Sequence, residues 1–230
     1  MEKNPSFLLK EVLVGSSDKK LNRQISLLKK QGRIRKIAPR LYSPIFKESA
    51  ETIVRRNLFE VIALLYPGAL LSHRSAFEFE PTSAGHIFLT HTYTRKVSIP
   101  GISLRFIEGP GPTDNDRIFY GNLRVSQQAR AFLENLQTLG TPGPTSRSIA
   151  LPRVEEKLEQ MIRIQGEEEM MQLREKAANL TRELNMERAF KRLEHIIGAL
   201  LSTRDVQVLN TSLGAARALG DQPFSPAKGS

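Results

Sequence analysis

The chain has 230 residues, of which 40% are hydrophobic, and this is enough for real cores in one large domain or about two to three small ones. It contains no cysteine, which excludes disulfides and thiolate metal sites and is typical of a reducing cytoplasm. No apolar run reaches the roughly 18 residues that cross a bilayer, and no signal-peptide pattern opens the chain. We therefore expect a cytoplasmic protein without a membrane partner.

The net charge of +10 is concentrated near the amino terminus. Residues 1–50 hold 12 Lys and Arg against 4 Asp and Glu, a balance of +8. This asymmetry predicts a localised site for a polyanion such as nucleic acid. The alternative interpretation is a basic surface that only keeps the protein in solution.

Residues 16–31 predict a helix with one apolar and one basic face. Ser16 or Ser17 can cap its start, and Gly32 stands where a helix ends. Apolar residues recur at i, i+4 and i+7, so they share one face and must bury it. The apolar face consists of Leu21, Ile25 and Leu28, and the basic face carries Lys19, Lys20, Arg23, Gln24 and Lys30.

A short hairpin is predicted to follow this helix. Residues 33–37 alternate basic and apolar, the period-2 pattern of a half-buried strand, and residues 41–42 return after a turn at Pro39. A basic helix followed by a basic hairpin is typical of a winged helix-turn-helix, whose helix reads base edges while the wing holds phosphates. The supporting helix is expected before it, with Phe7, Leu8, Val12 and Leu13 on its apolar face. This predicts a DNA-binding domain over residues 1–47.

Residues 48–138 predict a small mixed α/β middle domain. A helix over 48–66 ends at Pro67-Gly68, and a capped helix begins at Ser126. Between them, strand-like alternation separated by Pro and Gly predicts an antiparallel sheet. The expected strands are residues 86–91, 95–99, 102–107 and 118–125.

The remainder of the chain predicts a linker, a helical region and a tail. Residues 139–151 are rich in Gly, Pro and Ser and are expected to be the linker. Residues 152–220 carry three apolar stripes at helical spacing, which favours helix-on-helix packing. Residues 221–230 are expected to be a disordered tail, and the whole chain is predicted to be of the α+β class.

Several stretches resemble known families. Residues 16–43 and 53–78 are similar to the abortive-infection antitoxin (AbiEi-type) family of bacterial transcriptional regulators, and the best motifs are GRIRKIAPRLY and PGALLSHRSA. Residues 126–137, 151–177 and 195–205 look more like the amino-terminal half of some Fic-family proteins, in which an antitoxin-like winged helix precedes the Fic domain. The Fic motif H-[PF]-x-x-x-G-N-x-R is absent, so no adenylyl-transfer site is expected in this chain.

The resemblance implies promoter binding through the winged helix and a toxin as partner. In the antitoxin systems the winged helix represses the operon, while the middle and carboxy-terminal parts counter a nucleotidyltransferase toxin. The implied DNA-binding residues are Lys19, Lys20, Asn22, Arg23, Gln24 and Lys30 on the helix and Arg33, Arg35, Lys36 and Arg40 on the wing.

No pattern in the sequence predicts catalysis, a cofactor or a metal. The four histidines form no H-x-x-x-H or H-E-x-x-H spacing. His73 and Ser75 could be imagined as base and nucleophile, but no orienting acid is evident and no G-x-S-x-G elbow surrounds them. Helix capping by Ser72 or Ser75 is the simpler interpretation.

Two hypotheses therefore stand. The first is a DNA-binding regulator that represses its own promoter, with two copies on an inverted repeat or repeated half-sites expected, and with the carboxy-terminal helices as a candidate pairing surface. The second is a protein-interaction module without intrinsic catalysis, which neutralises a toxin or controls a Fic-type adenylyltransferase.

Overall fold

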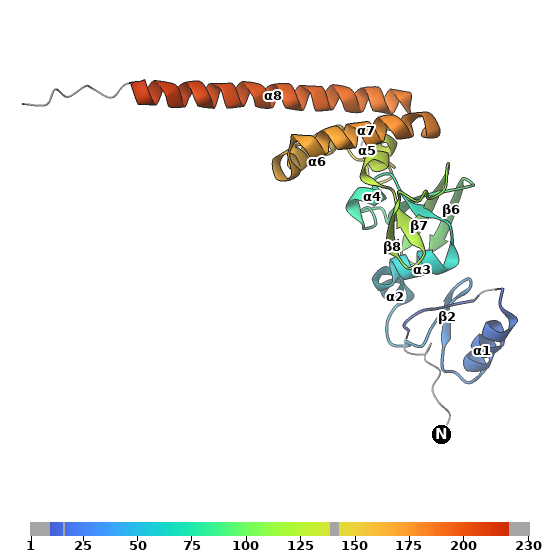
Figure 1. Ribbon diagram of the computed structural model, residues 1–230. Coiled ribbons are helices and arrows are strands. Elements are labelled where there is room, and N and C mark those ends of the chain that lie inside the picture. Colours follow the sequence, from blue (N-terminus) through green and yellow to red (C-terminus); the bar gives the residue numbers. More distant parts are fainter. Residues whose placement is uncertain (1–9, 16, 139–142, 221–230) are drawn as a thin grey trace, which may run out of the picture.

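The computed structural model describes residues 10–15, 17–138 and 143–220, with side chains described as far as Thr203. These residues form eight helices and two sheets, a mixed α/β arrangement with a helical carboxy-terminal part. The amino-terminal sheet lies at one end of the molecule, a larger sheet lies in the middle, and the last three helices lie at the other end (Figure 1). The tail expected at residues 221–230 falls outside the described residues.

The amino-terminal part contains a single described helix and a three-stranded sheet. Its elements are β1 (Leu13–Val14), α1 (Lys19–Lys30), β2 (Arg35–Ala38) and β3 (Leu41–Ser43), and the strand order is β1-β3-β2 with antiparallel pairing throughout. Helix α1 begins after Asp18, whose carboxylate accepts a hydrogen bond of 2.8 Å from the Lys20 amide, so Asp18 and not Ser17 is the cap.

The prediction of a helix around residues 7–13 is wrong for the carboxy-terminal end of that segment. Leu13 pairs with Tyr42 as a β-strand, and Phe7 and Leu8 lie outside the described residues. β-branched Val12 and Val14 flank Leu13, and alternating side chains in an extended segment can be buried on both faces of the sheet. Residues 10–15 and 17–47 thus show one helix, and a two-helix helix-turn-helix is not seen among them.

Both faces of the amino-terminal sheet are buried. One face carries Leu13 and Ile34, which pack against Ile25 and Leu28 of α1. The opposite face belongs to the main hydrophobic core, to which the sheet contributes Val12, Ala38 and Leu41. Hydrophobic packing is therefore continuous from the amino-terminal sheet into the middle of the molecule.

The helix predicted over residues 48–66 is broken at Asn57. It forms α2 (Ala50–Arg56) and α3 (Leu58–Leu65), the latter buried through Leu58 and Ile62. The Asn57 side-chain amide donates to the Ile53 carbonyl at 2.9 Å and to the Glu11 carboxylate at 2.7 Å. A short polar side chain that bonds to the backbone in this way competes with the helical hydrogen bonds, so the helix stops and restarts.

The middle sheet has six strands and is mixed, so the prediction of an antiparallel sheet is wrong. Strand β5 pairs in parallel with β7, and β4 pairs in parallel with β9. Alternation along a strand fixes its two faces but not the direction of its neighbours. In chain order the elements are β4 (Leu70–Leu71), α4 (Ser75–Glu78), β5 (His86–His91), β6 (Arg95–Ile99), β7 (Ile102–Glu108), β8 (Arg117–Tyr120) and β9 (Leu123–Val125), with strand order β6-β7-β5-β4-β9-β8.

Two tight hairpins build the edges of this sheet. The turn between β6 and β7 is Pro100-Gly101, where Gly101 has φ +71°, a left-handed conformation that glycine adopts without strain. This hairpin places β7 between β6 and β5. The single strand expected over residues 118–125 is likewise divided into β8 and β9 by a turn at Gly121, φ +53°.

Four helices complete the fold: α5 (Gln128–Gln137), α6 (Leu151–Gln165), α7 (Glu167–Leu184) and α8 (Glu187–Gly220). Helix α5 joins the two cores, because Ala131 packs into the sheet core while Phe132 and Leu136 pack into the helical core. The predicted stripes of α6 to α8 are buried there. Helix α8 extends as a long rod beyond the rest of the molecule (Figure 1).

The described part of the expected linker is attached to the middle of the molecule. Thr82 donates its hydroxyl to the Pro144 carbonyl at 2.6 Å, and the Arg74 guanidinium donates to the Gly143 carbonyl at 2.9 Å. The Ile149 amide donates to the Asn135 side chain at 3.0 Å. Residues 143–149 are therefore a fixed segment, while residues 139–142 lie outside the described part.

Candidate nucleic-acid interface

Helix α1 exposes its basic face because its apolar face is held by the sheet. Ile25 and Leu28 are buried, so side chains on the opposite side of the helix point to solvent. A hollow of about 510 Å³ follows this outer face. It is lined by Lys19, Asn22, Arg23, Ser26, Leu27 and Lys30.

The predicted helix residues do not all lie on this face. Lys19, Arg23 and Lys30 share it, and Asn22 borders it while half-buried. Lys20 and Gln24 are exposed but lie about 100° further around the helix axis than Lys19 and Arg23, respectively. Sequence reasoning missed Ser26 and Leu27, although their spacing of three and four residues from Arg23 is the signal that places them on the same face. The Leu27 side chain is 56% exposed.

Arg35 and Arg40, two of the four predicted wing residues, make hydrogen bonds to backbone carbonyls. The Arg35 guanidinium donates to the carbonyls of Ile45 (2.8 Å) and Glu48, so it ties the wing to the segment before α2 rather than pointing to a ligand. Arg40 has φ +62° in the turn, and its Nε donates to the Gly15 carbonyl at 2.9 Å. Arg33 and Lys36 are exposed.

The cations of α1 differ from nearby cations in their ion pairing. Among the described residues, no ion pair is formed by Lys19, Arg23 or Lys30. By contrast, Arg56 contacts Glu11 at 2.7 Å and Glu48 at 2.8 Å. Its hydrogen bond holds the pKa of the Glu11 carboxyl below the usual range. Positive charge is thus neutralised beside α2 and left uncompensated on the outer face of α1.

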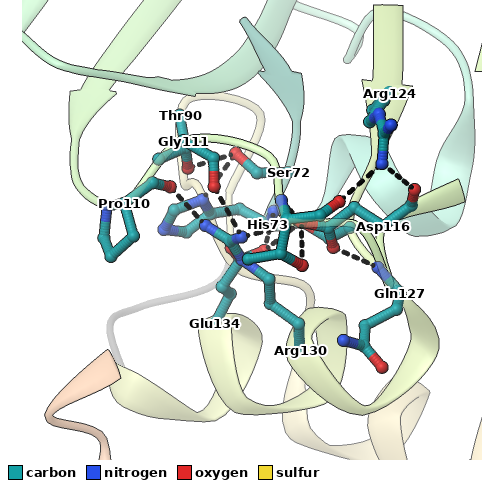
Figure 2. A network of polar contacts seen from close by, with 12 residues as sticks. Ser72, His73, Thr90, Pro110, Gly111, Asp116, Arg124, Gln127, Arg130 and Glu134 are labelled. Carbon is teal, nitrogen blue, oxygen red and sulfur yellow. Dashed lines mark hydrogen bonds and ion pairs between the residues drawn. The ribbon is translucent and has the colours of Figure 1, made fainter. Parts of the chain in front are cut away.

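A second group of polar residues is buried between the middle sheet and α5 (Figure 2). The Arg130 side chain, 1% exposed, donates to Asp116 and to Glu134 at 2.9 Å each and to the carbonyls of Pro110 and Gly111. Asp116 also accepts the Gln127 amide at 2.9 Å. Sequence reasoning missed this group, and its only signal was an Arg and a Glu four residues apart in an apolar helix.

The buried group also includes His73, which packs beside α5. His73 Nδ1 lies 3.0 Å from the Ser72 hydroxyl, and the Glu134 carboxylate accepts the His73 backbone amide at 2.9 Å. Burial lowers the pKa of His73 to about 4. Ser72, His73 and Glu134 are all buried.

The expected serine caps are absent from the structure. The Ser75 hydroxyl accepts the Phe88 amide at 2.9 Å, and the Ser72 hydroxyl accepts a hydrogen bond from Thr90 at 2.9 Å. Neither caps α4, which has no side-chain cap. The Ser126 hydroxyl donates to Glu134 instead of capping α5. Each hydroxyl lies near a buried polar group that needs a hydrogen bond from the protein. The start of a helix can bond to water instead, so the hydroxyl bonds to the buried group.

Searches for other kinds of site and for relatives were negative. Within the described residues, no three or more His, Asp or Glu side chains gather to hold a metal ion, and no helix is long and apolar enough to cross a membrane. No protein-family model matches the chain, and no curated protein and no solved structure matches it either.

Proposed function

We propose that the protein binds double-stranded DNA through the outer face of α1 and the β2–β3 wing, as an antitoxin-type regulator of its own promoter. The observation that carries the proposal is the unpaired basic face of α1. Its cations would neutralise phosphates and release counterions, which supplies most of the affinity of such interfaces. Asn22, Arg23 and Ser26 carry the hydrogen-bonding groups that can read base edges.

The wing has a smaller role in this proposal than the sequence suggests. Its exposed cations are Arg33, Lys36 and Arg40, of which Arg40 donates to the Gly15 carbonyl, while Arg35 is engaged by two carbonyls. One short helix presents few base contacts, so two copies on an inverted repeat are expected. The long rod of α8 is the element that would bring two copies together (Figure 1).

The test is fluorescence anisotropy on the upstream DNA of the gene, with scrambled DNA as competitor and several salt concentrations. We expect a preference of about 10³ or more for upstream DNA. The variant Arg23→Glu with Lys36→Glu should weaken DNA binding by about 100-fold or more. The reason is that each cation attracted to a phosphate is replaced by a carboxylate that the phosphate repels. Arg35 is left unchanged since its replacement would disturb the fold.

The matched control is Arg163→Glu with Arg182→Glu. Both arginines are exposed in the last turns of α6 and α7, and the pair changes the net charge equally. Binding that falls equally in both double variants would mean that only the overall charge matters. Binding that survives Arg23→Glu with Lys36→Glu would remove α1 from the interface.

A second candidate function, protein interaction, is favoured by one observation. Edge strand β8 exposes Ile118 at 66% and Tyr120 at 46%, and Leu64 of neighbouring α3 is 44% exposed. Exposed apolar side chains beside an open strand edge are suited to a protein partner such as a toxin. Ile118→Lys should abolish co-purification with a partner encoded beside the gene and leave DNA binding unchanged. Retained co-purification would exclude this edge as the contact.

A further inference from the structure

A second basic hollow lies on the middle sheet, far along the chain from α1. It has a volume of about 460 Å³ and is formed by the β6–β7 hairpin and the fixed segment 143–149. Its polar lining consists of Thr94, Arg95, Lys96, Arg105, Thr145 and Arg147. No carboxylate lines it. We call it the β6–β7 hollow.

The cations of the β6–β7 hollow are placed together without a counterion. Lys96 and Arg105 are direct cross-strand partners, an arrangement of like charges that destabilises a sheet. Among the described residues, neither side chain makes a hydrogen bond or ion pair. Arg147 adds a third cation, whose Nε donates only to the Thr138 hydroxyl at 3.3 Å. The fold therefore maintains a local positive charge that a bound anion would relieve.

Two buried polar atoms in the next row of the same sheet face are also unsatisfied. His86 and Ser103 are cross-strand partners, two residues along from Phe88 and Arg105. His86 Nδ1 and Ser103 Oγ are buried without a hydrogen-bond partner, and His86 is only 7% exposed. Burial and then the charges of Arg105 and Lys96 lower the pKa of His86, while a hydrogen bond with the Thr145 backbone opposes this shift. Unsatisfied buried atoms are rare in native proteins and commonly mark a missing ligand or water.

Protection of the sheet edge does not explain the whole arrangement. A lysine on an edge strand discourages pairing with another chain, and this accounts for Lys96 on β6. Arg105, however, lies on β7, one strand inward, where it is half-buried and protects no edge. A guanidinium held beside an ammonium and threonine hydroxyls has the donor set that phosphate oxygens require.

We propose that the β6–β7 hollow binds a phosphate group, with Arg105, Lys96 and Arg147 as its cationic contacts. The phosphate has two possible sources, a free nucleotide or a phosphodiester of bound DNA. The proposal does not depend on α1, because no residue of that helix lines the hollow.

The test compares thermal unfolding and amide NMR spectra of the full chain with 5 mM ATP, and with inorganic phosphate, against chloride at equal ionic strength. We expect ATP to raise the Tm and to shift the amide signals of β6, β7 and residues 143–149. The variant Lys96→Gln with Arg105→Gln should lose both effects. Its own Tm without ligand should equal or exceed that of the native chain, because a like-charge pair is removed. The control is Arg117→Gln on β8, at the opposite edge of the same sheet.

The two phosphate sources are separated by titrating the same proteins with a DNA duplex. A nucleotide source is shown when ATP shifts these signals and the double variant binds the duplex normally. A DNA source is shown when ATP has no effect but the duplex shifts the signals and the double variant weakens duplex binding by about 5-fold or more. Equal Tm increases in the native chain and the double variant, or no response of these signals to either probe, would overturn the proposal.

Discussion

At the scale of single residues, replacement of the buried Arg130 should strongly lower the stability of the fold. It neutralises Asp116 and Glu134, which are themselves buried, so its removal leaves two uncompensated carboxylates. Arg130→Met should lower the free energy of unfolding by about 3–5 kcal/mol, measured by urea denaturation. The exposed ion pair of Arg174 with Glu194 is the comparison, and Arg174→Met should cost about 1 kcal/mol or less. Similar losses in the two variants would contradict this role for Arg130.

At the same scale, the burial of His73 predicts how the stability of the protein depends on pH. Because burial lowers its pKa from 6.5 to about 4, the unfolded chain takes up a proton between these values and the folded chain does not. Stability must therefore fall as the pH decreases from about 6.5 towards 4, by about 2 kcal/mol between pH 8 and pH 5. His73→Asn, which keeps a residue tolerant of φ +54°, should remove that part of the pH dependence.

The measurement for His73 is urea denaturation of both proteins at pH 8 and pH 5. His86, whose pKa is also lowered, is present in both proteins and cancels from the difference. His195→Asn is the matched control, because it makes the same exchange at an exposed position of α8. A change in pH dependence that both variants share would not be due to the burial of His73. A His73→Asn variant with the full pH dependence of the native chain would show that the ring is not buried in its neutral form.

At the scale of elements, Arg35 and Lys36 have different roles in the wing. Arg35→Ala removes two hydrogen bonds from a charged donor and should lower the free energy of unfolding by about 1–3 kcal/mol. Lys36→Ala should change stability by less than about 0.5 kcal/mol. It should instead reduce the slope of log affinity against log salt on DNA by about one unit. Urea denaturation and DNA-binding anisotropy of both variants check this prediction. A large loss of stability in Lys36→Ala, with a reduced salt slope in Arg35→Ala, would contradict it.

At the scale of the whole molecule, the amino-terminal sheet is not an independent unit. Its second face, with Val12, Ala38 and Leu41, completes the core of the middle sheet. A fragment of residues 1–47 would expose that face and should be unfolded, although its sequence predicts a DNA-binding domain. Circular dichroism and amide NMR of this fragment, with the full chain as the control, check the prediction. A well-dispersed spectrum of the fragment would show that the sheet folds alone.

The local features of this protein can be predicted from the sequence. Residues 19–30 form the predicted helix with Ile25 and Leu28 buried, and the predicted stripes of residues 152–200 pack helix on helix. The strands near residues 86, 95 and 102 were also placed correctly. These features follow from hydrophobic periodicity, which depends only on neighbours along the chain.

Which segments meet, and which partner each polar side chain has there, could not be predicted before the three-dimensional fold was known. It made the middle sheet mixed, divided the helix at Asn57, and assigned Arg35 to two backbone carbonyls. It also placed Lys96 opposite Arg105, although eight residues lie between them in the sequence. The physical reason is that strand pairing and the partners of buried polar groups depend on contacts between distant segments, and the periodicity of one segment contains no information about its partner.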